Sequence, residues 1–465
     1  MSAASEPHYL EIAELAPLLR GRRLSPVELT EAMLARIEAL DGRLRAYARV
    51  TADEARAEAR AAETLIMRGE YRGLLHGIPL AVKDLFWTKG VATAAGTTVH
   101  AGFVPAEDAT VVRRLRQAGA IILGKLQLTE GAFATHHPSI APPVNPWGAD
   151  HWTGASSSGS GVATAAGLCH ASLGTDSGGS IRFPCAANGL TGLKPTWGRV
   201  SRHGSFELAA LLDHVGPIAR SAADARILFD AIEGHDPLDP TSLPGRSPVA
   251  ADEASLKGLR IGVDPYWNSN GTDDATQRAV ENAQAALRSL GASISEVRFP
   301  DAWHIAGQWE AQCGVQTAVA HAGTYPARAA EYGPALSRLI EIGRSLDGMG
   351  YQRLLLSAAA FTGRVNALLE TIDLLLVPVQ PFAAPTYDRL GALAADPEAN
   401  QRLIQYTAPF NISGHPSLTL PCGHTAEGMP IGFQLVARKG AERSLLGAGM
   451  ALQRDTGWHK ARPPC

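Results

Sequence analysis

The fold class is decided by residues 259–297, whose sequence is LRIGVDPYWNSNGTDDATQRAVENAQAALRSLGASISEV. Apolar residues dominate 259–263 and recur in 293–297, which is typical of two short buried strands. Between them, residues 274–290 place apolar side chains at helical spacing, and Gly291 ends the run. A strand, a helix and a second strand in succession form a crossover that pairs the strands in parallel and covers the sheet. The sequence therefore predicts an α/β fold with a mixed or mainly parallel sheet.

Other segments extend this pattern along the chain. Short apolar runs predict strands over 78–82, 120–123, 374–379 and 417–421. Helices are expected after the capping residues Ser25, Thr51 and Asp108, and throughout 300–370. Four prolines between residues 237 and 248 mark a loop or a subdomain edge. The length alone suggests about three domains, but no repeat or low-complexity linker separates them.

Composition excludes several classes of protein. The 465 residues carry 42 Lys plus Arg against 45 Asp plus Glu, a net charge of −3, so nucleic acid is not an expected partner. Apolar residues make up 45% and charged residues 19%, which favours a large core over disorder. Because no uninterrupted apolar run reaches about 18 residues, no membrane span is predicted. The acidic N-terminus lacks the basic and apolar regions of a secretory signal.

The cysteines point to a reducing environment without a structural metal. Five cysteines lie far apart, and no CxxC pair or His–Cys spacing typical of zinc occurs. An odd number of separated cysteines is typical of cytoplasmic proteins. We therefore expect a cytoplasmic protein with no metal site. The five are Cys169, Cys185, Cys313, Cys422 and Cys465.

Lys83 is the first candidate for chemistry, because it ends the apolar run Ile78–Val82. Lysine is almost never fully buried unless it has a partner. Taken alone, Lys83 is more often a strand-end lysine that reaches solvent than a catalytic group. The adjacent Asp84 is not expected to neutralise it, because neighbouring strand residues point to opposite faces.

The second candidate is the Gly/Ser segment Gly154–Gly161 (GASSSGSG), followed by the small apolar run Val162–Leu168. This pattern predicts a loop that opens a helix, whose N-terminus offers free N–H groups. It lacks the lysine of a phosphate-binding Walker loop, and Thr164 replaces the last glycine of a dinucleotide motif. A flexible surface loop remains the alternative at this level.

The third candidate is Gly174–Pro184 (GTDSGGSIRFP), in which two glycines precede Ser180. Such a serine can sit on a tight turn whose N–H groups stabilise an oxyanion. An ordinary glycine-rich turn between core elements is the alternative. The nucleophile elbow of α/β-hydrolases is not indicated, because Arg182 occupies the position of its last glycine.

Together these segments resemble the amidase signature family. The resemblance spans roughly 25–235 and 372–452, and the two candidate serines have the spacing found in that family. It implies an α/β fold with a large sheet covered by helices on both faces. It also implies one domain, made of N-terminal helices (1–70), a catalytic core (71–235), a variable, partly helical substrate-side region (236–371) and a C-terminal part of the core (372–465). The matching motifs are Gly77–Asp84, Asn145-Pro146, Gly154–Gly161, Gly174–Pro184, Gly192–Ser201, Leu420–Cys422 and Pro430–Leu435.

The resemblance also implies roles for individual residues. Ser180 would be the nucleophile, Ser156 a bridging serine in a cis peptide, and Lys83 the base. The backbone N–H groups of Ser177, Gly178 and Gly179, together with that of Ser180, would form the oxyanion hole. Ser157, Thr175, Asp176 and Arg182 would support the site.

These roles are physically coherent. A lysine with an ordinary pKa of about 10.4 is protonated at neutral pH and cannot act as a base. Burial beside the apolar run Ile78–Val82 would lower that pKa, because desolvation penalises the ammonium. Ser156 would then relay a proton between Lys83 and Ser180.

We therefore expect a hydrolase of a small, neutral amide, or of a carbamate or urea, that needs only water and no cofactor. An amidotransferase A-type subunit is the alternative, although Ile404 stands where that enzyme has an acidic residue. A catalytically inactive binding protein is disfavoured because Lys83, Ser156 and Ser180 are all present.

The sequence does not define the oligomeric state, for which a homodimer is one option. Side chains next to the motifs are candidate pocket residues or plain core: Phe133, Trp152, Ile181 and Phe183.

Overall fold

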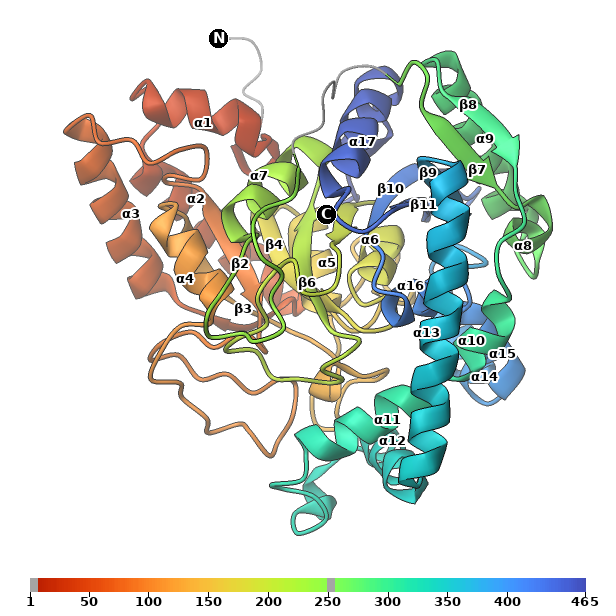
Figure 1. Ribbon diagram of the computed structural model, residues 1–465. Coiled ribbons are helices and arrows are strands. Elements are labelled where there is room, and N and C mark those ends of the chain that lie inside the picture. The colour runs from red at the N-terminus through yellow and green to blue at the C-terminus, as the bar shows by residue number, and fades with distance from the viewer. Residues whose placement is uncertain (1–6, 249–255) are drawn as a thin grey trace.

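One large mixed β-sheet forms the centre of the protein (Figure 1). The computed structural model describes residues 7–248 and 256–465. Within these ranges the sheet has 11 strands, in the order β1-β3-β2-β4-β6-β5-β10-β11-β9-β7-β8. The strands are β1 (Tyr47–Val50), β2 (Pro79–Lys83), β3 (Ile121–Leu126), β4 (Ala171–Asp176), β5 (Thr191–Lys194), β6 (His214–Ala219), β7 (Arg260–Val263), β8 (Ser293–Glu296), β9 (Leu374–Pro378), β10 (Ser417–His424) and β11 (Pro430–Ala437).

Strand pairing changes character across the sheet. The pairs β3–β2 and β2–β4 are parallel, as are β9–β7 and β7–β8. The pairs from β4 to β9 through the middle of the sheet are antiparallel, as is β1–β3. The predicted crossover is present, because β7 and β8 run parallel and α9 (Asp274–Ser289) joins them. The predicted α/β class with a mixed sheet is confirmed.

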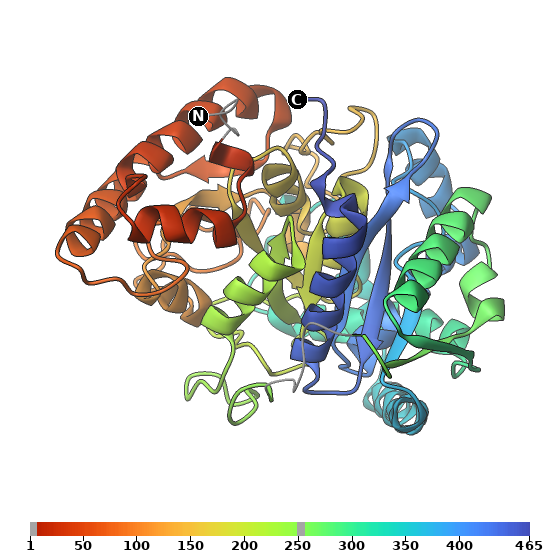
Figure 2. The ribbon, with the colours of Figure 1, turned by 90° about the horizontal axis from the view of Figure 1, so that it is seen from above.

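Helices cover both faces of the sheet (Figure 2). One face carries α7 (Ala222–Ile232), α17 (Glu442–Thr456) and α9, with α4 (Thr110–Gln117) packed against α7. The other face carries α5 (Ser158–Ala165) and α6 (Arg182–Asn188), which contact each other. Helix α5 begins at Ser158, inside the Gly/Ser segment, and α6 begins at Arg182, two residues after Ser180. Each helix therefore fixes the chain directly after one of the two candidate serines, Ser156 and Ser180.

The N-terminal helices are α1 (Ile12–Arg20), α2 (Pro26–Leu44) and α3 (Ala52–Met67). Ser25 caps α2 as predicted, and its hydroxyl accepts hydrogen bonds from the N–H groups of Val27 and Glu28. Thr51 precedes α3 but makes no capping bond with its side chain. Its hydroxyl donates instead to the carbonyl of Ile122, which ties α3 to the sheet.

The prediction that Asp108 caps α4 is wrong. The helix begins at Thr110, and the residue before it is Ala109. The Asp108 carboxylate pairs with Arg116 at 2.6 Å and accepts a hydrogen bond from the Lys89 N–H. The Asp108 carboxylate therefore binds these two groups and does not cap the N–H groups of α4. The sequence does not show that such competing partners lie within reach.

The predicted helical region 300–370 is confirmed, and it forms the outer part of the molecule with the long α13 (Gly348–Thr371) at its edge (Figure 1). The first residues of the acidic N-terminal stretch, 1–6, and residues 249–255 beyond the proline-rich loop lie outside the described ranges. No helix in the described ranges is long and apolar enough to cross a membrane. The remaining helices are α8 (Pro265–Ser269), α10 (Ala302–Gly307), α11 (Trp309–Ala320), α12 (Pro334–Ser345), α14 (Tyr387–Ala394), α15 (Pro397–Ile404) and α16 (Ala408–Ile412), with short 3-10 turns at Pro7–Tyr9, Glu130–Ala132, Ala329–Glu331 and Trp458–Lys460.

The register of β2 and β4 places the candidate residues together. These strands are parallel neighbours, with Ala81 opposite Ser172 and Val82 opposite Leu173. The carboxyl ends of parallel strands lie at the same edge of a sheet, where loops of α/β proteins carry their sites. Lys83, at the end of β2, therefore lies beside Thr175 and Asp176 at the end of β4.

A substitution at Gly159 can test how closely α5 packs against the neighbouring backbone at this edge of the sheet. A Cβ added there would lie 2.3 Å from the Ala46 carbonyl oxygen and 2.6 Å from the Gln127 nitrogen. Since backbone cannot yield cheaply, we expect Gly159→Ala to lower the free energy of unfolding in urea by about 1–3 kcal/mol. The control Gly391→Ala lies in α14 with no atom within 4 Å, so it should be neutral or stabilising, by up to about 1 kcal/mol. Equal effects of the two substitutions would contradict this packing.

Candidate active site

Lys83 is fully buried at the end of β2, and its ammonium group donates hydrogen bonds to three hydroxyls. The Nζ atom lies 2.7 Å from Ser156 Oγ, 2.9 Å from Ser157 Oγ and 2.8 Å from Thr175 Oγ1. The alternative of a lysine that reaches solvent is therefore wrong. The end of strand β2 and the Gly/Ser segment are therefore in direct contact, as the sequence predicts.

Burial sets the protonation of Lys83. Desolvation of the ammonium lowers the pKa of Lys83 to about 7, against the opposing influence of the carboxylates of Asp213 and Asp176. Neither carboxylate forms an ion pair with Lys83 within the part of the chain that the structure describes. A substantial neutral fraction of the amine is therefore available near neutral pH.

Asp84 turns away from Lys83, as the strand geometry predicts. Its carboxylate lies 3.3 Å from the Nζ atom of Lys125, a second buried lysine on β3. Lys125 also donates to the Phe86 carbonyl and the Thr93 hydroxyl, each at 2.7 Å. The two buried lysines thus have different surroundings, and of these two only Lys125 has a carboxylate partner among the described residues. The sequence gives no signal that separates their roles, other than the motif around Lys83.

The Gly/Ser segment is a buried part of the site and not a flexible surface loop. Ser156, Ser157 and Ser158 are all fully buried, and the Ala155–Ser156 peptide bond is cis. The Ser157 hydroxyl donates to the Thr175 carbonyl at 3.2 Å, so its proton is already used. The Ser157 N–H donates to the Ser180 carbonyl at 3.3 Å. This bond places the segment that carries Ser156 next to the half-buried Ser180.

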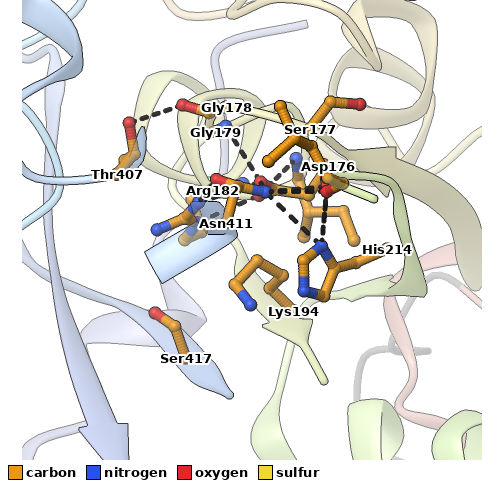
Figure 3. Close-up of polar contacts among 12 residues, drawn as sticks. Asp176, Ser177, Gly178, Gly179, Arg182, Lys194, His214, Thr407, Asn411 and Ser417 are labelled. Atoms are coloured by element: carbon orange, nitrogen blue, oxygen red, sulfur yellow. Dashed lines mark hydrogen bonds and ion pairs between the residues drawn. The ribbon is translucent and has the colours of Figure 1, made fainter. Parts of the chain in front are cut away.

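A buried ion pair supports the turn that carries Ser180 (Figure 3). Arg182 donates to both carboxylate oxygens of Asp176, at 3.0 and 2.9 Å. The N–H groups of Gly179 and Ile181 donate to the same carboxylate, at 2.9 and 3.1 Å. Burial alone would raise the pKa of Asp176, but the Arg182 guanidinium, Lys194 and the Asn411 amide together outweigh burial and hold that pKa below its ordinary value. Asp176 is therefore a fixed anion around which the turn folds.

Asn411 on α16 completes this network, and the sequence alone did not assign it to the site. Its amide donates to Asp176 Oδ1 at 2.8 Å and to the Asp176 carbonyl at 2.9 Å, and its carbonyl oxygen accepts from Arg182 at 2.6 Å. Arg182 also donates to Gln434 Oε1 at 3.2 Å. In the sequence, Asn411 stands out only as an Asn-x-Ser pattern and as the match to an asparagine of the amidotransferase A subunit, from which the position of Ile404 is counted. Its role arises because α16 lies against the turn in space, as Figure 3 shows.

The glycine-rich turn offers fewer free donors than the sequence predicts. The Gly179 N–H is already bonded to Asp176, so the expectation that it serves an oxyanion hole does not fit this geometry. The N–H groups of Ser177, Gly178 and Ser180 donate to no acceptor within residues 7–248 and 256–465. These three remain as candidate donors to a substrate oxygen.

The four candidate pocket residues lie in three separate places. Trp152 and Phe183 pack together with ring centroids 5.5 Å apart, and Phe133 stacks on Trp309 at 6.3 Å. Ile181 is fully buried in a separate core cluster, so it is a packing residue and not part of a pocket wall. Its companions in that cluster are Ala165, Cys185, Leu190 and Ile218.

Known proteins resemble this chain over nearly its full length. A model of the amidase family matches residues 28–446. The protein named Putative amidase AmiD, from Mycobacterium tuberculosis H37Rv, is 48% identical over 456 residues, which cover 98% of this chain and 96% of that protein. The A subunit of the glutamyl-tRNA(Gln) amidotransferase of Moorella thermoacetica is 39% identical over 485 residues, which cover 98% of this chain and 99% of that protein.

The fold is shared with solved structures as well. One, from a vestigial protein complex that reveals the evolutionary origins of an s-triazine catabolic enzyme, has a TM-score of 0.90 at 33% identity and covers 98% and 100% of the two chains. These matches define an enzyme class that hydrolyses carbon–nitrogen bonds of amides. The chain belongs to the amidase signature family, and it is an amidohydrolase.

The Asp176–Arg182 pair allows a stability test of the site. Arg182→Met leaves a buried carboxylate uncompensated, so we expect the free energy of unfolding to fall by about 3–5 kcal/mol. The control is Arg260→Met, which breaks a pair with Asp373 of the same 2.9 Å length at a half-exposed position. The control should cost far less than Arg182→Met in the same urea titration, because solvent screens this exposed pair. A loss for Arg182→Met as small as that of the control would show that Asp176 does not depend on the guanidinium.

Proposed function

We propose that the protein hydrolyses a small, neutral amide, or a carbamate or urea, through an acyl-enzyme on Ser180. Lys83 is the base and Ser156 the proton relay. The observation that carries this proposal is the buried Lys83 amine, with a pKa of about 7 and 2.7 Å from Ser156 Oγ. A neutral amine in that position can accept a proton from a serine hydroxyl.

Proton movements follow from these contacts. Neutral Lys83 accepts the proton of Ser156, and Ser156 accepts the proton of Ser180 as Ser180 Oγ attacks the substrate carbonyl carbon. The free N–H groups of the glycine-rich turn stabilise the oxygen that becomes negative. Collapse of this intermediate breaks the C–N bond. Ser156 delivers its proton to the leaving nitrogen and takes one back from the Lys83 ammonium, so Lys83 is neutral again. Water then attacks the acyl ester on Ser180, and Ser156 and Lys83 again accept and return the proton. This step releases the acid and restores Ser180.

The apolar side of the site supports a neutral substrate. Trp152 and Phe183 belong to a buried cluster, and Ile404 at the end of α15 packs against that cluster. A charged substrate group beside these side chains would lose its hydration without gaining a partner. The other members of the cluster are Ala186, Val379, Phe382 and Leu403.

An A-type amidotransferase subunit is the second candidate function. The 39% identity to the A subunit of a glutamyl-tRNA(Gln) amidotransferase favours it. Ile404 disfavours it, because the position expected to hold the ammonium of glutamine is apolar and packed. A glutaminase assay of the purified protein, with and without a lysate that supplies partner subunits, separates the two functions: partner-dependent glutamine hydrolysis would support the amidotransferase.

We also propose a cytoplasmic location for this reaction. All five cysteines are free thiols, four of them buried. Burial raises the pKa of the Cys169 thiol to about 12 and raises that of the Cys313 thiol as well, so these thiols are unreactive. Unpaired cysteines are typical of a reducing compartment.

The nucleophile and base can be tested directly. Ser180→Ala and Lys83→Met should each lower kcat by at least about 1,000-fold on aryl amides, aliphatic amides and carbamates. The screen is run by product detection over a panel of neutral and charged substrates. Ser139→Ala, at an exposed serine outside the site, is the matched control and should retain wild-type rates. Wild-type turnover by Ser180→Ala would eliminate the acyl-enzyme.

The pH dependence of kcat/KM tests the state of Lys83. The active form is the neutral amine, whose pKa burial lowers from 10.5 to about 7. Therefore kcat/KM should fall as pH drops through about 7 and reach a plateau above it. This acidic limb of the pH profile should follow the titration of a single proton. The carboxylate of Asp213 raises the pKa of Lys83, so Asp213→Asn should shift the limb to lower pH. A limb near pH 10, or an unchanged limb in Asp213→Asn, would contradict this assignment.

A further inference from the structure

We propose that Trp309 is a positioning residue that orients the oxyanion-binding peptide between Ser177 and Gly178. The inference rests on the proposed function, because it assigns a role in stabilising the oxygen of the substrate carbonyl. Trp309 is the first residue of α11, in the 300–370 region for which the sequence indicates no chemistry. The geometry gives this variable region a direct contact with the turn that carries Ser180.

Two side chains hold two consecutive carbonyl groups of the turn. The indole N–H of Trp309 donates to the Ser177 carbonyl oxygen at 2.7 Å. The Thr407 hydroxyl donates to the Gly178 carbonyl oxygen at 2.6 Å, as Figure 3 shows. In a trans peptide the C=O of one residue and the N–H of the next point in opposite directions. Each side chain therefore fixes the direction of the N–H that follows its carbonyl partner.

The two peptides differ in what their N–H groups reach. The peptide after Gly178 is held at both ends, because Thr407 binds its carbonyl and the Gly179 N–H donates to Asp176 at 2.9 Å. The peptide after Ser177 is held by Trp309 at the carbonyl end, while the Gly178 N–H donates to no acceptor in the described parts of the chain. A free donor held in a fixed direction is what an oxyanion requires. Trp309 is thus the group that fixes the direction of one of the three donors left available to substrate.

Packing reinforces the hydrogen bond. A Cβ added at Gly178 would lie 2.5 Å from the Trp309 ring, so the ring lies directly on the Gly178 backbone. The Trp309 ring also stacks on Phe133, with an interplanar angle of 16°. Glycine imposes little conformational restriction of its own. Without Trp309, rotation of the Ser177–Gly178 peptide would turn its N–H away from the substrate.

The Ser177 side chain is held independently of Trp309. Its hydroxyl donates to Asp213, whose carboxylate also accepts hydrogen bonds from the N–H groups of Leu208 and Ala209. Loss of the indole N–H therefore leaves Ser177 attached to the fold through its side chain. A Trp309 variant is expected to stay folded and to lose mainly the orientation of one peptide.

The test compares Trp309→Phe with Trp303→Phe. Trp309→Phe keeps an aromatic ring and removes the N–H, and Trp309 is only half-buried, which favours folding. Trp303 lies on α10, is also half-buried, and has Arg402 over its ring at 5.9 Å. We expect Trp309→Phe to lower kcat about 10- to 100-fold with KM changed less than about threefold, somewhat less than loss of an oxyanion donor itself. Trp303→Phe should stay within about twofold of wild type in both parameters.

A second readout separates orientation from a merely structural role. An aryl trifluoromethyl ketone forms a tetrahedral oxyanion with a nucleophilic serine, whereas a neutral amide ligand does not. We expect Trp309→Phe to weaken binding of the ketone about as much as kcat falls, with binding of the amide unchanged. Trp309→His should recover part of the loss, because imidazole Nε2 occupies the same ring position as indole Nε1. Thermal unfolding midpoints confirm that each variant is folded.

Failure of this inference differs from failure of the proposed function. Ser180→Ala is assayed beside the tryptophan variants. If Ser180→Ala is inactive while Trp309→Phe matches Trp303→Phe in kcat and ketone binding, the positioning role is overturned. The same holds if Trp309→Phe raises only KM, or if Trp309→His is no better than Trp309→Phe. If Ser180→Ala retains wild-type activity, the acyl-enzyme itself is wrong.

Discussion

The site depends on one buried lysine that has no carboxylate of its own among the described residues. The carboxylates near Lys83 have other partners: Asp84 pairs with Lys125, Asp176 pairs with Arg182, and Asp213 accepts from Ser177 and two backbone N–H groups. Desolvation therefore outweighs attraction, and the pKa of Lys83 falls to about 7. A nearby unpaired carboxylate would have restored the ammonium and removed the base.

The rest of the fold keeps this arrangement rigid. The parallel pairing of β2 with β4 places Lys83 beside Thr175, and α5 and α6 start from the two serine segments at that edge. Elements distant in sequence then close the site: α16 contributes Asn411 to the ion pair, and α11 contributes the indole that holds Ser177. The core carries the lysine and the serines, whereas the outer helices hold the turn beside them.

Features that depend on residues close together in the chain could be predicted from the sequence, and contacts between distant segments could not. Local patterns indicated the α/β class, the cap at Ser25 and the strand that ends at Lys83, because each depends on neighbouring residues. The resemblance to amidases brought Lys83 and Ser156 together correctly. Contacts between distant segments were missed, such as those of Asn411 and Trp309, and Asp108 was assigned as a cap although its partner is Arg116. No periodicity in one segment shows which turn it will meet in space.

A titration of the Lys83 amine tests the central claim most directly. Selectively labelled lysine, followed by NMR at the Cε and Nζ positions and assigned with Lys83→Met, reports the protonation of this one side chain. We expect a midpoint near the value of about 7 that burial produces. A midpoint near the ordinary lysine value of about 10.4 would show that Lys83 stays charged at neutral pH and would contradict its role as base.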